Sequence, residues 1–226
     1  MHIIVSLLLA ILISAGLLIF LAFPLMILGL VGSFKSASVL VISLAQTAAY
    51  LLVVKLRFIK TNFWSGLGFN KIELKNYLKL GLKYWLAIEA TALIWDFLLT
   101  KLGLSPSGPG GRTWITGLKF LPLVYVYFSQ AILGPLGEEV FFRGYVFRFL
   151  RQKQSFFKAA IISAFLFALI HLDIKMFPLL ILHGYWYAKM TEKSKSIVPA
   201  YTAHMLKNLL VIWFQTVPVV WYTNLR

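Results

Sequence analysis

Residues 134–144 read Gly-Pro-Leu-Gly-Glu-Glu-Val-Phe-Phe-Arg-Gly, and this stretch decides both the fold and the chemistry expected of the chain. The chain holds only seven acidic residues, and two of them, Glu138 and Glu139, stand side by side here. They follow an uncharged run from Phe120 to Gly137. Ionisable groups at membrane depth are costly, so such a pair is a functional hypothesis by default.

The two glutamates face different directions if the stretch is helical. Glu139 and Arg143 are four residues apart and share a helix face, so they can form an ion pair. Glu138 is rotated by about 100° from Glu139 and lacks that partner. One interpretation is that Glu139 is structural and Glu138 is available for chemistry. The other is that both glutamates only neutralise arginines inside a helix bundle.

Composition places the chain among polytopic membrane proteins. Of its 226 residues, 60% are hydrophobic, and the mean hydropathy is +0.84, which is far outside the soluble range. We therefore expect an all-α bundle that forms a single integral membrane domain over residues 1–226. The net charge of +15 comes from Lys and Arg between the apolar runs, a pattern of membrane topology and lipid headgroups and not of nucleic-acid binding. The absence of cysteine excludes disulfides, thiol catalysis and thiolate metal sites.

About seven apolar segments are predicted to cross the membrane, with eight as the alternative. They cover residues 3–31, 36–54, 84–102, 119–150, 159–172, 176–188 and 196–218. The first is too long for a signal peptide and has no basic region before it. Lysines at every fourth position over residues 71–83 predict an amphipathic helix on the membrane surface, or else a solvated connector. Residues 103–111, rich in Gly and Pro, predict a long loop.

The distribution of basic residues predicts the orientation. With the N-terminus in the cytoplasm, the inner connections carry fourteen Lys and Arg and the outer connections carry six. This bias predicts a multi-pass protein of the cell membrane whose loops around Lys71, Lys153 and Lys193 face the cytoplasm.

Four polar side chains from three segments are expected at one depth. Counted from the nearest basic turn, Glu138 lies about 18 Å along its helix, and His171 lies about 20 Å along the next one. His204 and Asn208 are one turn apart on the last segment, with Asn208 at a similar count. One buried histidine is usually a packing residue, but four such groups in one layer favour a site. His183 is not matched in depth by other polar groups, and it is interpreted as a packing or interfacial residue.

Three further charged residues lie within apolar segments. Glu89 and Asp96 are seven residues apart and share one helix face, where they either pair with basic groups or line a polar cavity. Lys207 lies between His204 and Asn208 and is predicted to pair with Glu89 or Asp96.

Hydrolysis is the chemistry that this set of side chains favours. A buried carboxylate takes a proton from water more readily because burial raises its basicity. An imidazole can hold that water, and a second His with an Asn can donate hydrogen bonds to the oxygen that becomes negative in acyl transfer. The sequence contains neither a Ser-His-Asp arrangement nor the HExxH zinc motif.

These motifs resemble the CPBP family of intramembrane proteases, which includes Rce1-type CAAX prenyl endopeptidases and bacterial Abi proteins linked to bacteriocin immunity. The resemblance rests on Glu138-Glu139-x-x-x-Arg143, Phe167-x-x-x-His171 and His204-x-x-x-Asn208, and the predicted catalytic core is about residues 119–218. It implies that Glu138 and His171 activate water, that His204 and Asn208 form the oxyanion site, and that Glu139 and Arg143 are structural. The chain departs from the Rce1-type fold in having seven predicted spans instead of eight.

The preferred function is therefore an intramembrane endopeptidase that acts on a peptide or membrane-protein substrate, with the lipid bilayer as its other partner. The alternative is a catalytically silent immunity or peptide-binding scaffold protein of the same fold.

No cofactor is expected, because the segments around His171 and His204 are apolar and offer few partners to orient zinc ligands. If the enzyme were instead zinc-dependent, the three ligands would be His171, His204 and Glu138. Oligomeric state is open.

Overall fold

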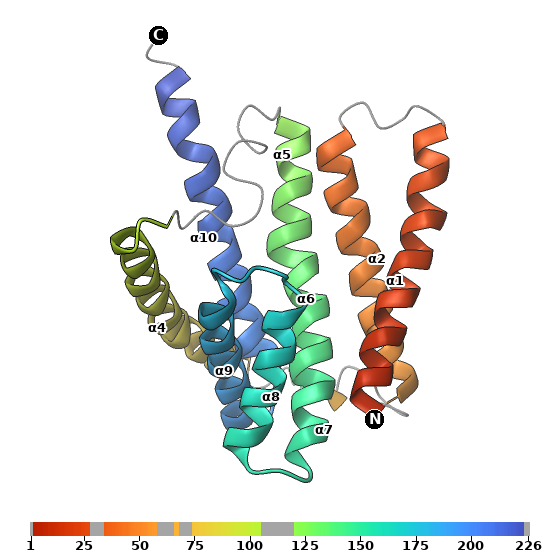
Figure 1. Cartoon of the computed structure of the whole chain (residues 1–226), viewed down its shortest axis with the longest axis vertical. Helices are drawn as coiled ribbons and strands as arrows, with labels where there is room; N and C mark the ends of the chain where they lie inside the picture. Colours follow the sequence, from red (N-terminus) through yellow and green to blue (C-terminus); the bar gives the residue numbers. More distant parts are fainter. Residues whose placement is uncertain (1, 28–33, 58–65, 68–73, 105–119, 224–226) are drawn as a thin grey trace. The chain divides into compact units, whose positions relative to one another are not determined.

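The computed structural model describes residues 2–27, 34–57, 66–67, 74–104 and 120–223, and within them the chain is all-helical, as predicted (Figure 1). The α-helices are α1 (His2–Ile27), α2 (Phe34–Arg57), α4 (Leu74–Lys101), α5 (Phe120–Tyr127), α6 (Gly134–Glu138), α7 (Arg148–Arg151), α8 (Phe156–Leu169), α9 (Phe177–Ser194) and α10 (Val198–Thr223). Two π-helices, η2 (Phe128–Leu133) and η3 (Glu139–Phe147), lie on either side of α6. The helices belong to two compact units.

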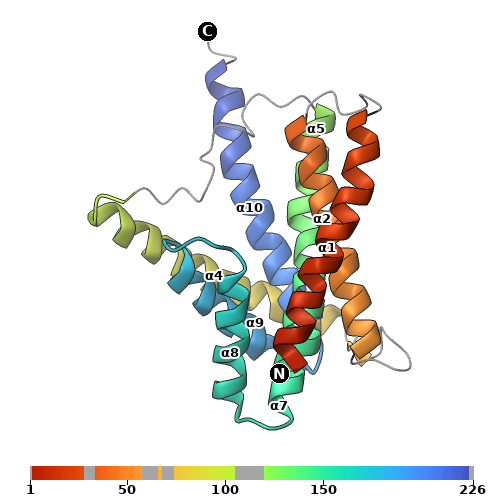
Figure 2. The ribbon, with the colours of Figure 1, turned by 45° about the vertical axis from the view of Figure 1, so that its right-hand side comes forward.

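The first unit contains residues 1–61, 112–141 and 208–226. In it α1 packs along α2, and α2 packs against α5, η2 and α6 (Figures 1 and 2). Val126, Ala131 and Ile212 form a small buried cluster between α5, η2 and α10. The apolar sequence of these elements explains their helical form, since a helix satisfies its own backbone hydrogen bonds.

The second unit contains residues 62–111 and 142–207. In it α8 packs along α9, and α9 packs against α4 (Figures 1 and 2). Its cores are built from aromatic side chains that pack against alanines: Tyr84, Ile88, Tyr187, Met190, Ala200 and Ala203 in one cluster, and Phe147, Ala159, Ala160 and Ala188 in another. Small residues on one helix let the aromatic rings of the next come close.

The amphipathic lysine stretch is not a separate element, which corrects the prediction. The part that the structure describes, from Leu74 onward, continues without a break into the expected third span as the 28-residue helix α4. Its buried face packs on the protein, because a Cβ on Gly81 would lie 2.8 Å from the Pro199 carbonyl oxygen of α10. Lys71 and the loop residues 105–111 lie outside the described residues.

The fifth segment ends earlier than predicted, which places one candidate residue outside a helix. Helix α8 begins after Ser155, whose side chain accepts the Lys158 amide, and it ends at Leu169. His171 therefore lies in the turn that follows, just before Leu172, whose φ of 52° is left-handed. The sixth segment is longer than predicted, since α9 continues to Ser194.

The prediction of seven membrane spans is not confirmed by the structure. Among the residues described, no helix has both the length and the apolar character that a membrane crossing requires.

Candidate active site

Glu138 ends the short helix α6, which is pressed against α2 in the first unit. A Cβ on Gly137 would lie 2.9 Å from the Thr47 Cα atom, so only glycine permits this approach. The Thr47 hydroxyl donates to the carbonyl of Leu133, the last residue of η2, at 2.9 Å and so holds α2 to the residue just before α6. The Glu138 side chain is half-buried, whereas Glu139 is fully buried. The two neighbouring glutamates thus differ in burial.

Tyr50 of α2 is a further candidate site residue, which was not predicted from the sequence. Its hydroxyl accepts a hydrogen bond from Gln46 Nε2 at 3.1 Å, its ring stacks on Phe141 at 4.7 Å, and Glu138 acts on it electrostatically. Only 4% of Tyr50 is exposed. The signal in the sequence was the pair Gln46 and Tyr50, two polar residues one helical turn apart within an apolar segment.

Asn208 is oriented by the π-helix η2 of the same unit. Its Nδ2 atom donates to the Gln130 carbonyl oxygen at 2.8 Å. A carbonyl oxygen only accepts, so this contact fixes which end of the amide is the nitrogen. The Gln130 side chain in turn donates to Ser43 Oγ at 3.2 Å. One of the two Nδ2 hydrogens of Asn208 is used here, and the other remains for a ligand.

The motif stretch itself differs from the expected α-helix. From Glu139 to Phe147 the backbone is a π-helix, in which hydrogen bonds join residues five apart, so successive side chains are rotated by less than in an α-helix. The Phe142 carbonyl accepts a bond from Ser163 Oγ of α8 at 3.0 Å, so a neighbouring helix supports the wider turn. Such π-helical insertions are frequent at functional sites.

Arg143 is completely buried among aromatic rings of the second unit. Its guanidinium carbon lies 4.5 Å from the centre of the Phe167 ring and 5.0 Å from that of Tyr187, which are cation–π distances. Its Nη2 atom donates to the Gly184 carbonyl at 3.3 Å. A Cβ on Gly184 would lie 2.7 Å from Ala164 Cβ and 3.2 Å from Arg143 Nη2, so this glycine makes room for the arginine.

The same two rings hold both candidate histidines. Phe167 contacts His171 with ring centres 4.6 Å apart and His204 with ring centres 5.9 Å apart. Tyr187 stacks on His204 at 4.9 Å. The structure therefore brings His171, His204 and Arg143 together around shared aromatic rings, whereas Glu138, Glu139 and Asn208 belong to the first unit.

The tautomer of His171 follows from one hydrogen bond. Its Nδ1 atom lies 2.7 Å from the Phe167 carbonyl oxygen. Since that oxygen only accepts, Nδ1 carries a proton, and in the neutral imidazole Nε2 is then the hydrogen-bond acceptor. His171 is half-buried, so this acceptor belongs to a side chain that solvent reaches.

Two other predictions can be compared with the structure. Lys207 pairs with Glu89 at 3.5 Å, so of the two partners predicted for it Glu89 is confirmed. His183 is 5% exposed and packs beside Tyr187 at 6.5 Å, which fits the packing role. Within the described residues, no three His, Asp or Glu side chains gather as a potential metal site.

Comparison with known proteins identifies relatives of this chain. The family model described as type II CAAX prenyl endopeptidase Rce1-like matches residues 120–210. The "Putative membrane peptidase YdiL" of Bacillus subtilis (strain 168) is 33% identical over 136 residues, which cover 60% of this chain and 55% of the relative. The UPF0177 protein YxdF of Lactococcus lactis subsp. lactis (strain IL1403) is 32% identical over 122 residues, which cover 51% of this chain and 67% of the relative.

The chain thus spans little more than half the length of the first relative. No solved structure matches the chain significantly. The matched range 120–210 includes Glu138, His171, His204 and Asn208 but not Tyr50.

Proposed function

Because the chain belongs to the Rce1-like family of type II CAAX prenyl endopeptidases, we propose that it is an intramembrane endopeptidase of glutamic type. Glu138 takes a proton from a water molecule, which His171 holds through Nε2, and the water oxygen attacks the carbonyl carbon of the peptide bond. His204 and Asn208 donate hydrogen bonds to the oxygen that becomes negative. Glu138 then gives the proton to the leaving amine. The reaction needs no metal in this proposal.

The observation that carries the proposal is the bond between His171 Nδ1 and the Phe167 carbonyl. It makes Nε2 of the neutral imidazole the ring nitrogen that can accept a hydrogen bond from water. The orientation of Asn208 adds to this, since its remaining Nδ2 hydrogen suits an oxyanion donor.

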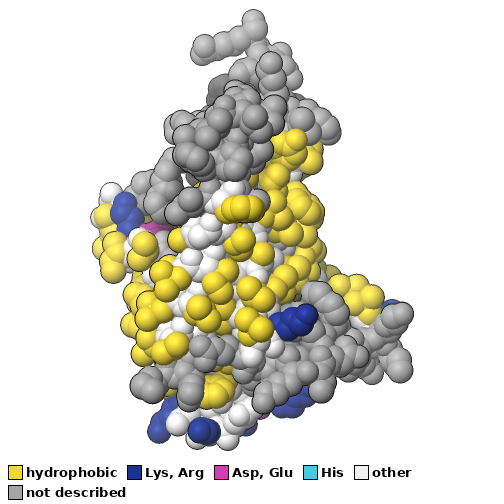
Figure 3. Space-filling model, turned by 90° about the vertical axis from the view of Figure 1, so that its right-hand side faces the viewer, with side chains coloured by type: hydrophobic (Ala, Val, Ile, Leu, Met, Phe, Trp, Pro, Cys, Tyr) yellow, Lys and Arg dark blue, Asp and Glu magenta, His cyan; other side chains and the backbone are white. Residues whose placement is uncertain are grey.

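The proposed location is the bilayer of the cell membrane, as a multi-pass protein with a cytoplasmic N-terminus. The family and the name of the Bacillus relative suggest a membrane protein. Large apolar side chains are also widely exposed, including Leu12 at 69% on α1 and Leu93 at 71% on α4. Figure 3 shows hydrophobic side chains spread over the face that includes α1. Exposed apolar surface of this extent favours contact with lipid.

Replacing Glu138 tests the proposed base. The purified full chain in lipid nanodiscs is incubated with a library of membrane peptides, and cleavage is read by mass spectrometry. Glu138→Gln keeps the side-chain size but removes the basic oxygen, so turnover should fall by about 10²–10⁴-fold. Asp96→Asn, which neutralises an acid on α4, is the matched control and should keep normal turnover.

The outcomes separate the enzyme from a silent scaffold protein. Near-normal turnover in Glu138→Gln would show that Glu138 is not the general base. A wild-type chain that retains peptides without cleaving any of them would instead support the scaffold alternative.

A second pair of variants tests the structural role proposed for Glu139 and Arg143. Both side chains are fully buried. Glu139→Ala and Arg143→Ala should each lower the free energy of unfolding by about 3 kcal/mol, because each removes a buried polar group and leaves the groups around it without that partner. Thermal unfolding in detergent measures this loss. Unchanged unfolding temperatures, with activity abolished, would assign these residues a catalytic role instead of a structural one.

A further inference from the structure

A pocket of about 350 Å³ lies at the end of the second unit where α7 and the last turn of α9 meet. Its lining residues are Phe147, Arg148, Arg151, Gln152, Thr191, Glu192 and Lys195. None of the candidate catalytic residues is among them. The volume falls within the range of about 300–1,000 Å³ that is usual for small-molecule sites.

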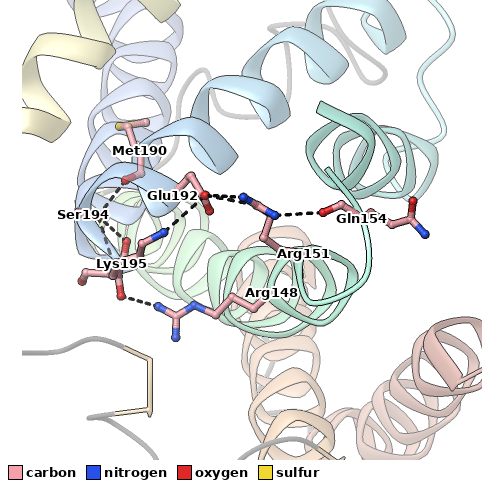
Figure 4. A network of polar contacts seen from close by, with 8 residues as sticks. Arg148, Arg151, Gln154, Met190, Glu192, Ser194 and Lys195 are labelled. Carbon is pink, nitrogen blue, oxygen red and sulfur yellow. Dashed lines mark hydrogen bonds and ion pairs between the residues drawn. The ribbon is translucent and has the colours of Figure 1, made fainter. Parts of the chain in front are cut away.

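Cations outnumber acids in this pocket. Arg151 and Lys195 share one carboxylate, since Arg151 Nη2 lies 3.2 Å and Lys195 Nζ 3.4 Å from the same Glu192 oxygen (Figure 4). Arg148 adds a third cation, and its guanidinium donates to backbone carbonyls. Three positive charges thus face one negative charge across the lining.

The position of Arg148 is explained by the fold alone. Its guanidinium donates to the carbonyl oxygens of Gly66 and Leu67 and, at 2.7 Å, to that of Lys195. Lys195 ends α9 with a left-handed φ of 56°, so Arg148 caps the end of this helix. The excess charge of Arg151 and Lys195 over Glu192 has no such structural explanation.

Both of these side chains keep hydrogens for a ligand. Arg151 donates Nε and Nη2 to Glu192 and Nη1 to the Gln154 carbonyl at 3.0 Å, which leaves one hydrogen on each Nη atom (Figure 4). The Lys195 ammonium has three hydrogens, and the contact with Glu192 uses one. The Arg148 contact fixes the backbone that carries Lys195, although the Lys195 side chain is 76% exposed. The Lys195 ammonium is therefore carried by a backbone that the Arg148 contact holds in place.

We propose that this pocket binds a phosphate group, with Arg151 and Lys195 as its charged donors. Arginine forms two parallel hydrogen bonds to phosphate, and lysine adds a point charge. Phe147 and the aliphatic parts of the arginines supply an apolar wall beside the charge, as the glycerol and acyl portions of a phospholipid would require. The phosphate comes either from an anionic phospholipid headgroup or from free phosphate. This site is independent of the peptidase chemistry.

The test uses the full chain in phosphatidylcholine nanodiscs with two probes. Phosphatidylglycerol is added in increasing fraction, and the lipids retained are counted by native mass spectrometry. Inorganic phosphate is added to separate nanodiscs, and binding is read from the thermal unfolding midpoint. Lys195→Gln should weaken binding by about fivefold, the effect of one basic residue near an anionic surface. Lys153→Gln, an exposed lysine outside the pocket, is the matched control and should bind normally.

A double variant separates a formed site from general charge. Arg151→Gln with Glu192→Gln removes one cation and one anion, so the net charge is unchanged, and it should still weaken binding. Retention of phosphatidylglycerol with this dependence assigns the site to a lipid headgroup. Binding of inorganic phosphate alone, with the same dependence, assigns it to free phosphate. Equal weakening in Lys195→Gln and Lys153→Gln, or no binding of either probe, overturns the proposal.

Discussion

At the residue scale, the proposed chemistry depends on which atoms of two side chains, His171 and Asn208, are left to act. Phe167 fixes the His171 proton on Nδ1, and Gln130 fixes the orientation of the Asn208 amide. Both partners are backbone carbonyls, so substitution of a neighbouring side chain does not remove them. This kind of support keeps a site oriented before the substrate arrives.

Asn208 should matter for the rate more than for substrate binding. Asn208→Ala removes the donor proposed for the oxyanion, which forms only in the transition state, so kcat should fall by about 10²–10³-fold with KM little changed. Steady-state kinetics with a cleaved peptide measures the two constants. A rise in KM alone would show that Asn208 binds the substrate and does not stabilise the oxyanion.

Chelation should leave the activity intact, because the proposed base and donors act without a metal. The purified chain, dialysed against a chelator, should hold much less than one zinc per chain by elemental analysis and retain its turnover. Activity that is lost on chelation and restored by zinc would recast His171, His204 and Glu138 as ligands.

At the element scale, close helix packing depends on glycines that have no room for a methyl group. Gly81 sets α4 against α10, Gly137 sets α6 against α2, and Gly184 sets α9 against α8. At Gly184 the backbone of α8 is the obstacle, since a new Cβ would lie 2.8 Å from Ala164 Cα. A backbone atom cannot rotate away as a side chain does.

Gly184→Ala should therefore push α8 and α9 apart and disturb the rings that hold Arg143. Overpacking of this kind costs about 1–3 kcal/mol, so the unfolding temperature should fall. Gly16→Ala on α1 is the matched control, because nothing lies within 4 Å of its new Cβ. Helix propensity predicts that this control is stabilised by about 0.5–1 kcal/mol. Thermal unfolding that ranks the two variants in the opposite order would contradict the packing argument.

At the scale of the whole molecule, the proposed orientation depends on where the basic turns lie. The turn between α7 and α8 carries Lys153, which is exposed. The positive-inside bias predicts that this turn faces the cytoplasm.

Labelling of Lys153→Cys tests this orientation without background, because the chain has no native cysteine. An impermeant thiol reagent should leave intact cells unlabelled and should react after the membrane is opened. Labelling from outside intact cells would reverse the predicted orientation, and with it the side of the membrane from which a lipid headgroup reaches Arg151.

The sequence by itself determined the helical class, the family and the residues worth testing. Apolar periodicity and the spacing of Glu138, His171, His204 and Asn208 are local properties, so they can be read without a fold. The sequence limited the acid that pairs with Lys207 to Glu89 or Asp96, since an isolated cation in an apolar segment needs an acid. Tertiary structure selected Glu89.

Only the tertiary structure decided what surrounds each of these side chains. The electrostatic influence of Glu138 on Tyr50, the rings around Arg143 and the proton on His171 Nδ1 depend on groups brought together by packing or by the end of a helix. The continuous helix α4 was also missed, because its lysines suggest a surface element, whereas its small Gly81 lets it dock on α10. Spacing along the chain specifies which face a residue occupies, but contacts between residues far apart in sequence specify its chemical environment.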